Sequence, residues 1–550
     1  MKKVIALLIA LSMVLSIAAC GGGGQPAPAP EQSSPPPMID ITQTNDQTSP
    51  GSATPAAPEP PPAASGPQYG GVVKMITTAD TSYPFGLAWN SALNFATQVI
   101  VPFGECLVLE TTGGDIKPWL ATEWEIDVEK AEVRLKLRDD VYFSDGSKFN
   151  AEVVEWNFVK SKEAKALNPA IDRVEKRGEY EVAAVMTNGV FANNILNLLA
   201  SHSFAITSKE HFDKNGEDYA GEHPVGTGPF VMTEKNPGVS VKFTKNDKYW
   251  QPGKPYLDGF EFHAIVDVMT QNAALLSTGS DRVDVLNGGS AEQLSFLGGD
   301  PDLTVWAFPN GVTAIYPSSN NEDSPFAKQE VREAVSYAID RKQFADAKGY
   351  GYLAPATQFI PDGYYGHFND GRDLFEYDPA KAKELLAAAG YPNGFTTNWY
   401  AANTMDQDMS VILVDMLSAV GIKCELEFPD AGRMTELRST GWEGMLFMPF
   451  TSLAAVPSTF RLQLDPPGIY NVSTWRPPGY EVDFAALLRT PTYDQGIAEN
   501  MHHWFADYML IVPVIEQVNS YVVRNSIQDA EYGFWAVGTQ WLPSDMWLSE

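Results

Sequence analysis

The pattern of apolar and polar positions predicts strands and helices that alternate along most of the chain. Residues 71–76 are apolar enough for a first strand, and residues 133–137 alternate apolar and charged side chains, the period of a half-buried strand. Residues 422–428 repeat that alternation. We therefore expect strands at these three places.

Helical spacing is clearest over residues 329–345, where one apolar stripe is formed by Val331, Ala334, Val335, Ala338 and Ile339. Asn150 is expected to cap a helix that starts at residue 151. Further helices are predicted over residues 405–420 and after Asp378, with Pro379 in the first turn and Gly390 at the end. Helices that alternate with strands predict an α/β fold in which helices cover a sheet.

The first twenty residues predict export rather than a membrane-spanning helix. Lys2 and Lys3 precede an apolar run over residues 4–19, which as a helix would span about 24 Å, short of the ~30 Å hydrocarbon core. Residues 1–19 therefore have the pattern of a signal peptide. Cys20 follows Ala18 and Ala19 and resembles the acylated cysteine of bacterial lipoproteins. The alternative is soluble secretion with an unmodified cysteine.

Residues 20–68 differ in composition from the rest of the chain. From residue 21 they contain 13 of the 40 prolines, and the remainder is mostly Ala, Ser, Gly, Gln and Thr. Such a segment has too little apolar surface to offset the entropy of ordering, so we expect a disordered tether. A large folded body is expected from residue 69 onward.

Composition narrows the range of partners. The chain has 550 residues with 69 acidic and 38 basic side chains, a formal net charge of −31. This balance argues against nucleic-acid binding and against adsorption to an anionic membrane, which both need clustered Lys and Arg. With 44% hydrophobic residues the chain can bury a large core, and three cysteines cannot form a disulfide framework.

No catalytic, metal or cofactor motif has a credible spacing. The seven histidines show no zinc-ligand pattern, and His502-His503 is expected to be an exposed or capping pair on a helix. Residues 226–230 (GTGPF) resemble a phosphate loop only superficially, since proline follows where a helix should start; they predict a tight turn between strands. Cys106 and Cys424 either form one disulfide or stay separate core thiols, and we favour the thiols.

Several stretches resemble, in order, the motifs of one protein family: 118–125 (PWLATEWE), 137–154 (LRDDVYFSDGSKFNAEVV), 224–230 (PVGTGPF), 246–259 (NDKYWQPGKPYLDG), 331–341 (VREAVSYAIDR), 385–394 (LLAAAGYPNG) and 420–422 (VGI). The family is that of the extracellular solute-binding proteins of ABC importers, family 5, which includes oligopeptide-, dipeptide- and nickel-binding proteins. Asp140 and Val153 depart from the usual glycine and acid at their positions.

This resemblance implies a two-lobed periplasmic-binding-protein-like fold with a hinge between the lobes. Lobe I would comprise residues 69–307 and a C-terminal return over 512–550, and lobe II residues 308–511. The ligand would be enclosed at the hinge, and the closed form would dock on a membrane permease whose ATPase subunits are separate chains. The resemblance further implies an extracytoplasmic monomer held at the membrane only by its lipid anchor, without catalysis, cofactor or metal.

Pocket residues in this family come from many loops and follow no motif. Aromatic side chains beside Pro, Gly or Asn are the candidates, because loops often carry binding sites. The expected ligand contacts are Tyr83, Trp89, Asn94, Tyr316, Phe359, Tyr400, Asn403, Phe450, Trp475 and Arg476.

One departure from the family bears on the ligand. Peptide-binding members carry an aspartate that pairs with the free amino group of the peptide, but the corresponding segment 450–460 contains no acid, and Leu453 takes the aligned position. An unpaired ammonium buried there would cost several kcal/mol, which disfavours a typical di- or oligopeptide. Over residues 445–480 the only charges are Arg461, Asp465 and Arg476. If Arg476 faces the cleft, a carboxylate-bearing or aromatic ligand is favoured; otherwise both arginines lie on the surface.

Three functions are consistent with these patterns. The first is capture of a small organic solute, peptide-like or carboxylate- or aromatic-bearing, for import. The second is a surface sensor of the same fold that feeds no transporter. The third is an extracellular hydrolase that uses a pair of carboxylates brought together only by folding.

Overall fold

The computed structural model describes residues 66–77, 81–90, 97–111, 115–191, 195–356, 358–360, 367–368, 376–451, 471–491, 494–530, 533–535 and 538–549. The predicted signal peptide, Cys20 and nearly all of the predicted tether lie outside these residues. Asn94, Leu453, Arg461 and Asp465 lie outside them as well.

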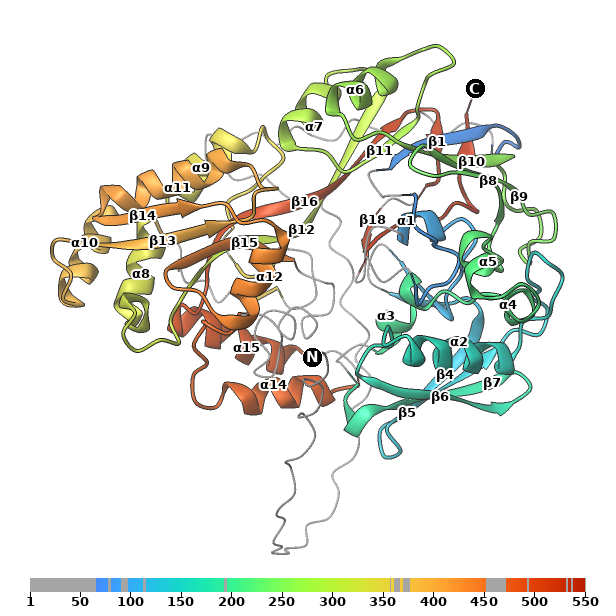
Figure 1. Ribbon diagram of the computed structural model, residues 1–550, viewed down its shortest axis with the longest axis horizontal. Helices are drawn as coiled ribbons and strands as arrows, with labels where there is room; N and C mark the ends of the chain where they lie inside the picture. Colours follow the sequence, from blue (N-terminus) through green and yellow to red (C-terminus); the bar gives the residue numbers. More distant parts are fainter. Residues whose placement is uncertain are drawn as a thin grey trace, which may run out of the picture. The chain divides into compact units, whose positions relative to one another are not determined.

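A ten-stranded mixed sheet runs through the described part of the chain, in the order β14-β13-β15-β12-β16-β11-β1-β10-β9-β8 (Figure 1). Its strands are β1 (Val72–Thr77), β8 (Phe230–Asn236), β9 (Ser240–Lys245), β10 (Gly259–Ala264), β11 (Val285–Asn287), β12 (Leu303–Pro317), β13 (Phe395–Ala401), β14 (Ile422–Glu427), β15 (Met445–Thr451) and β16 (Val512–Arg524). The long strands β12 and β16 pair antiparallel in the middle of the sheet and join its two halves, β14-β13-β15 and β11-β1-β10-β9-β8.

A second, antiparallel sheet has the order β4-β5-β7-β6. Its strands are β4 (Ala121–Asp127), β5 (Glu132–Leu137), β6 (Ile171–Gly178) and β7 (Glu181–Met186). Three two-stranded sheets are formed by β2 (Val108–Glu110) with β3 (Ile116–Pro118), β17 (Ile527–Gln528) with β20 (Trp547–Leu548), and β18 (Gly533–Trp535) with β19 (Gly538–Gln540).

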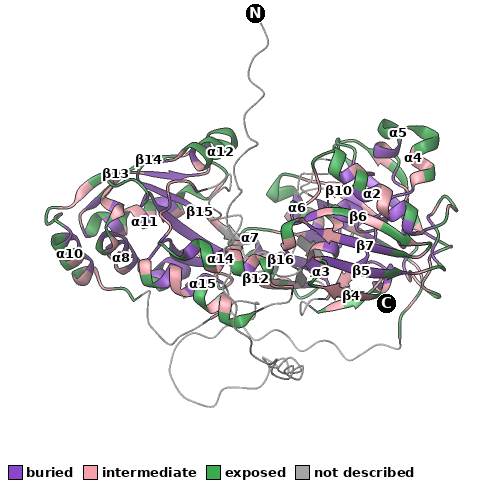
Figure 2. Cartoon of the chain, turned by 90° about the horizontal axis from the view of Figure 1, so that it is seen from below, coloured by how far each residue is buried: buried purple, intermediate pink, exposed green. Residues whose placement is uncertain are grey.

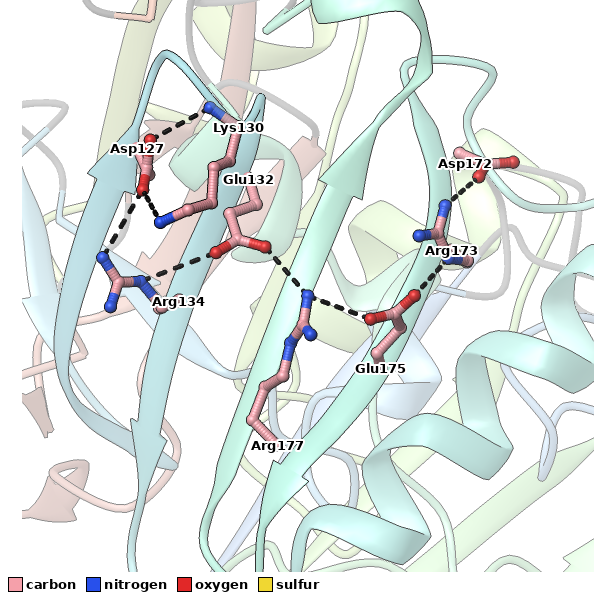
Figure 3. A network of polar contacts seen from close by, with 8 residues as sticks. All are labelled: Asp127, Lys130, Glu132, Arg134, Asp172, Arg173, Glu175 and Arg177. Carbon is pink, nitrogen blue, oxygen red and sulfur yellow. Dashed lines mark hydrogen bonds and ion pairs between the residues drawn. The ribbon is translucent and has the colours of Figure 1, made fainter.

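Figure 3 shows a chain of ion pairs on the four-stranded sheet. Glu132 accepts from Arg177 at 2.9 Å, and Arg177 also lies 2.9 Å from Glu175. The pairs continue to Arg173 on one side and to Arg134 and Asp127 on the other. The network spans β4, β5 and β6, so it ties strands that are not neighbours in the sheet.

The described helices lie before, between and after these strands. They are α1 (Thr97–Ile100), α2 (Ala151–Glu163), α3 (Ile195–Leu199), α4 (Lys209–Asn215), α5 (Glu217–Glu222), α6 (Val268–Leu276), α7 (Ala291–Leu297), α8 (Gln329–Ala338), α9 (Arg341–Lys348), α10 (Pro379–Ala388), α11 (Gln407–Ala419), α12 (Ala431–Thr440), α14 (Tyr480–Arg489) and α15 (Gln495–Tyr508), with short 3-10 turns η1 (Thr187–Gly189), η2 (His202–Phe204) and η3 (Pro325–Ala327).

Buried residues are concentrated in the strands, while helices such as α5 and α10 are largely exposed (Figure 2). The buried apolar side chains form separate clusters. The buried members of the largest cluster lie between Ala314 and Ile515, and we name this cluster the 314–515 core. The 107–206 core fills one face of the four-stranded sheet, and the 73–546 core lies on β1, β8, β9 and β10.

Most of the predicted elements are confirmed within a residue or two. The strands predicted at 71–76, 133–137 and 422–428 are β1, β5 and β14, and the helix predicted over 405–420 is α11. Asn150 caps α2, since its side chain accepts from the Val153 N–H at 3.1 Å. Asp378 caps α10 in the same way, with Pro379 as the first helical residue.

The single helix predicted over residues 329–345 is wrong, because the chain breaks there into α8 and α9. Ile339 is extended (φ −96°, ψ 112°), and the Asp340 side chain caps α9 by accepting from the Gln343 N–H at 2.8 Å. Arg341 occupies the break, where it donates to the carbonyls of Ser336 and Ile339 and, at 2.7 Å, to that of Pro513. The apolar stripe is buried as predicted but lies in α8 and at Ile339, and the buried Phe344 and Ala345 continue the apolar face in α9.

Arg332 is buried to 1% exposure in α8, although the apolar stripe gave no sign of a buried charge. Its guanidinium donates to the carbonyls of Phe326, Ala327, Tyr508 and Met509 at 2.6–3.1 Å. Burial lowers the pKa of Arg332 to about 10, which leaves it protonated at neutral pH. Arg332 and Arg341, with their carbonyl acceptors, form what we name the arginine brace, which fixes the chain where α15 turns into β16.

Two further expectations need correction. The turn at residues 226–230 follows helix α5 rather than a strand, and it leads into β8. His502 is buried in α15, with its ring 5.6 Å from that of Phe359 and 5.3 Å from that of Phe368, whereas His503 remains partly exposed. Helical geometry turns adjacent side chains to different faces, and here one of those faces is apolar.

Candidate functional site

Strand order marks one edge of the ten-stranded sheet as a candidate binding site. The parallel strands β14, β13 and β15 lie side by side, with β13 in the middle. The chain passes from β13 through α11 to β14, and then through α12 back across β13 to β15. In open α/β sheets ligands bind outside the carboxyl ends of strands where the order reverses in this way. The carboxyl ends of β13 and β15 are such a point.

Three of the predicted ligand contacts belong to this edge, which we name the β13–β15 edge. Tyr400 lies near the end of β13 and Asn403 just after it, while Phe450 lies at the end of β15. The backbone N–H of Asn403 donates to the Pro429 carbonyl at 2.9 Å, which fixes the loop after β13 to the loop after β14. Phe450 pairs in register with Val312 of β12. In the β13–β15 register Tyr400 lies beside Leu446, so Phe450 follows further along β15 toward the same end of the sheet.

The surroundings of Tyr400 favour a neutral hydroxyl. Burial raises the pKa of Tyr400, and the nearby Glu427 carboxylate adds to the rise, while Arg433 opposes it. Arg433 is itself paired, at 3.0 Å from Glu436 and 3.8 Å from Glu427. The edge thus offers a phenol and an amide, which suit hydrogen bonding to a polar solute rather than acid–base catalysis.

Three other predicted contacts lie in or against the 314–515 core. Tyr316 in β12 and Phe359 are almost completely buried, and the Trp442 indole donates to the Tyr316 carbonyl at 3.1 Å. The Trp475 ring packs edge-on against Tyr508, with ring centroids 5.6 Å apart, and the Arg332 guanidinium lies 5.9 Å from its centroid. In these positions the three aromatic side chains contribute to the packing of the 314–515 core.

The Arg476 guanidinium is bonded within its own loop. It donates to the carbonyls of Thr474 at 2.6 Å and Asn471 at 3.4 Å. The loop is fixed in turn because the Trp475 N–H donates to Ser319 Oγ at 2.9 Å. A bidentate clamp on a carboxylate would require Arg476 to leave these carbonyls.

The remaining predicted contacts come from the segment before α1. Tyr83 is 65% exposed, whereas Trp89 is buried and packs edge-on against Trp156 and Phe212. The structure therefore brings Tyr400, Asn403 and Phe450 to one edge and places Trp89 in a separate small cluster.

Side chains from several family motifs converge on a buried carboxylate that no sequence pattern had singled out. Glu105 Oε1 accepts from the Trp119 indole at 2.9 Å and the Tyr249 hydroxyl at 2.8 Å. Its Oε2 accepts from the Thr227 hydroxyl at 2.7 Å and the Trp250 indole at 2.9 Å. All four donors belong to the motif stretches 118–125, 224–230 and 246–259, but Glu105 lies outside every one of them. We name these five residues the Glu105 node.

The glycines of the GTGPF turn explain why it fits against this node. A Cβ on Gly226 would lie 2.0 Å from the Phe103 carbonyl oxygen, and one on Gly228 would lie 2.6 Å from the Phe103 carbonyl carbon. The turn therefore packs directly on the backbone two residues before Glu105 and presents Thr227 to it. The motif is a close-packing device and not a phosphate site.

A small cavity adjoins the node. Its volume is about 30 Å³, and its lining includes Glu105, Cys106, His202 and Trp541. That volume suits a water molecule and is too small for an organic solute. Burial lowers the pKa of His202 to about 4, so its imidazole is neutral at physiological pH.

Metal and thiol chemistry have no evident place in the described part of the chain. Among those residues, no group of three or more His, Cys, Asp or Glu side chains could hold a metal ion. The prediction of two separate thiols is confirmed, since Cys106 and Cys424 are not bonded to each other. Burial raises the pKa of the Cys424 thiol to about 12 and that of Cys106 as well, so both stay protonated.

A search for membrane-crossing segments, confined to the described residues, finds no helix both long and apolar enough to span a bilayer.

Comparison with known proteins identifies the family. The sequence model of the bacterial extracellular solute-binding proteins, family 5 (middle region), matches residues 115–467. The glutathione-binding protein GsiB of Salmonella typhi is 30% identical over 391 residues, which cover 68% of this chain and 75% of that protein.

Solved structures support the same fold. CtaP of Listeria monocytogenes, an ABC transporter substrate-binding protein, superposes with a TM-score of 0.76 at 20% identity, covering 88% of this chain and 100% of that one. DppA of Helicobacter pylori, solved with the peptide STSA, gives 0.69 at 22% identity, covering 88% and 99%. These relatives are two-lobed solute-binding proteins of ABC importers that work outside the cytoplasm, and they are not enzymes. The chain belongs to family 5 of the bacterial extracellular solute-binding proteins.

Proposed function

We propose that the protein captures a small peptide-like or carboxylate-bearing solute between two lobes and delivers it to an ABC permease. The observation that carries this proposal is the reversed strand order at the β13–β15 edge, where Tyr400 and Asn403 lie at the end of β13 and Phe450 lies at the end of β15. A neutral phenol, an amide and an aromatic residue at such an edge suit recognition of a polar solute without chemistry on it.

The lobes that we propose are residues 69–307 with 512–550, and residues 308–511. The distribution of the cores supports this division. Members of the 314–515 core come almost entirely from the proposed lobe II, whereas the 107–206 and 73–546 cores come from the proposed lobe I. Strand β12 crosses the proposed boundary at residues 307–308, and β16 begins at the second boundary and pairs along β12, as hinge strands would.

The solute class rests on two supports. The relatives include a glutathione-binding protein and a protein solved with a tetrapeptide, and a further structural neighbour was solved with agropinic acid. Residues 450–460 contain no acid to pair with a peptide amino group. We therefore propose a ligand recognised through carboxylates and amides rather than through a free α-ammonium.

We further propose that Cys20 is acylated and that residues 20–68 form a tether. The protein then acts as a monomer at the membrane surface and delivers its solute to a permease with separate ATPase subunits. The anchor and the tether are supported by the sequence of residues 1–68, and the permease by the family. Mass spectrometry of the mature N-terminus in the native host tests the anchor. A diacylated or triacylated Cys20, lost in Cys20→Ala, is expected, whereas an unmodified N-terminus would contradict it.

Native mass spectrometry and calorimetry test the capture function. Protein purified from its host is expected to retain one small molecule, and glutathione, N-blocked peptides and opine-type acids form the first titration panel. Tyr400→Ala and Phe450→Ala are each expected to weaken binding at least tenfold, whereas Tyr219→Ala, an exposed tyrosine of α5, should not. Binding unchanged by both edge variants would overturn the placement of the site. A folded protein that retains and binds nothing would overturn capture itself.

A further inference from the structure

Glu105 lies at the boundary between two of the apolar cores. Phe103, two residues before it, belongs to the 73–546 core, and Leu107, two residues after it, belongs to the 107–206 core. Its donors come from both sides of that boundary, because the Trp119 and Trp250 rings pack against the 107–206 core, while Thr227 lies in the turn that packs on Phe103 of the 73–546 core. We propose that the Glu105 node is a pH-responsive joint, which fastens these two cores while Glu105 is neutral and weakens when Glu105 ionises.

The hydrogen-bond geometry allows either charge state but makes the states unequal. Each carboxylate oxygen accepts from one indole and one hydroxyl. The indoles can only donate, so a proton on Glu105 must be donated to Thr227 Oγ1 or to the Tyr249 hydroxyl, which then turns its own proton elsewhere. Gln251 Nε2 donates to the Tyr249 hydroxyl at 3.2 Å. Protonation therefore reorganises one hydroxyl and leaves both indole bonds in place.

The ionised state is the costly one, because all four of these partners are uncharged. Glu105 is 5% exposed, and a buried carboxylate without a bonded cation is unfavourable. The titratable groups beside it are neutral at pH 7: the Cys106 thiol, the Tyr249 phenol, whose pKa burial raises, and the His202 imidazole. The charged groups are second neighbours, namely Arg138, whose guanidinium lies 4.4 Å from the Trp250 ring centroid, and Asp545, which acts on Tyr249 and is paired with Lys254.

The balance of these effects places the titration near neutrality. Burial raises the pKa of Glu105 from 4.5 to about 7, while the four hydrogen bonds oppose the rise. When the two cores separate at the node, water reaches Glu105 and the carboxyl group can ionise. Separation of the cores therefore becomes easier as pH rises. By linkage, with 4.5 for the open form, the opening equilibrium grows about tenfold from pH 6 to pH 8.5.

Indole NMR of the intact protein tests the titration directly. In ¹⁵N-tryptophan-labelled protein, assigned with Trp119→Phe and Trp250→Phe, both indole N–H signals are expected to shift between pH 5.5 and 8.5 with one shared midpoint near 7. Trp442, whose indole donates to a backbone carbonyl, is the internal control and should not shift. Because this experiment needs no substitution of Glu105, it remains decisive if that variant fails to fold. Static indole signals over this range would overturn the proposal.

Hydrogen exchange tests the joint. Amides of residues 224–250, corrected for intrinsic rates, are expected to exchange about tenfold faster at pH 8.5 than at pH 6 in the wild type and equally at both in Glu105→Gln. Glu110→Gln, a substitution at another buried acid, bonded by Asn197, should keep the wild-type response. Acceleration that persists in Glu105→Gln would assign the response to another group and overturn the proposal.

Discussion

The Glu105 node and the arginine brace both bury a charged or chargeable side chain, yet they satisfy it with different partners. Glu105 is held by four neutral side-chain donors, whereas Arg332 donates only to backbone carbonyls. A guanidinium with a pKa of about 10 keeps its charge at every physiological pH, but a carboxyl group with a pKa near 7 does not. The brace is therefore a permanent tie, and the node is a tie whose strength depends on pH.

The comparison also explains the family motifs. Arg332 and Arg341 belong to the stretch 331–341, and four members of the node belong to the stretches 118–125, 224–230 and 246–259. In both places the motif residues hold segments together, and none of them belongs to the β13–β15 edge. Motifs identify this family through its scaffold, which leaves the ligand contacts free to vary.

The largest expected effect comes from removing the brace. Arg332→Met leaves four buried carbonyls without their donor and should lower the free energy of unfolding by about 4 kcal/mol. Arg332→Lys should recover less than half of that loss, because a lysine ammonium group cannot donate to all four carbonyls that the planar guanidinium reaches. Urea denaturation followed by circular dichroism measures both, with the exposed Arg173→Ala as the control, expected within about 1 kcal/mol of wild type. A loss below about 1.5 kcal/mol for Arg332→Met would show that the brace is not a strong tie.

The turn that presents Thr227 to the node should be nearly as sensitive. Gly226→Ala drives a methyl group into the Phe103 carbonyl and is expected to cost about 3 kcal/mol, since backbone rather than a flexible side chain must move. The matched control is Gly432→Ala in helix α12, where the nearest atom to the added Cβ is Asp430 Oδ1 at 3.4 Å. That change should stabilise the protein by up to about 1 kcal/mol. Equal melting temperatures for the two variants would contradict the close-packing account.

Stability as a function of pH separates the node from the brace. The folded-state pKa of Glu105 is raised to about 7, so its favourable contribution is complete below about pH 4.5 and is lost as pH rises through 7. The loss amounts to at most about 3 kcal/mol. Glu105→Gln should remove this component from a series of urea titrations between pH 5 and 8.5, while Arg332→Met, which introduces no titratable group, should lower all values without changing the slope. A slope unchanged in Glu105→Gln would contradict the assignment.

The ion pairs that the partly exposed Arg177 makes on the four-stranded sheet should give the smallest effect. Arg177→Ala removes the link between Glu132 and Glu175 drawn in Figure 3, and it should cost about 1 kcal/mol at low salt and less at high salt. Thermal melting at two salt concentrations measures this, with Lys342→Ala, a simple helix-surface pair with Asp346, as the control. A salt-independent loss would show that Arg177 acts through packing over the sheet instead.

The sequence by itself determined the local elements and the family. Periodicity and capping residues placed β1, β5, β14, α2, α10 and α11, because these signals act within a few residues along the chain. The motifs identified a family 5 solute-binding protein for the same reason, since each motif is a contiguous stretch.

The break between α8 and α9 escaped prediction because the apolar stripe continues through it, and only the fit of Arg341 against Pro513 requires it.

Only the tertiary structure decided which distant residues meet. Strand order places Tyr400 of β13 beside Leu446 of β15, and Glu105 acquires Trp119, Thr227, Tyr249 and Trp250 from segments up to 145 positions away. Trp89, Tyr316 and Phe359 looked like loop aromatics, but apolar surface from other segments buries them. Burial and partner choice are set by packing over long sequence separations, and local patterns do not record them.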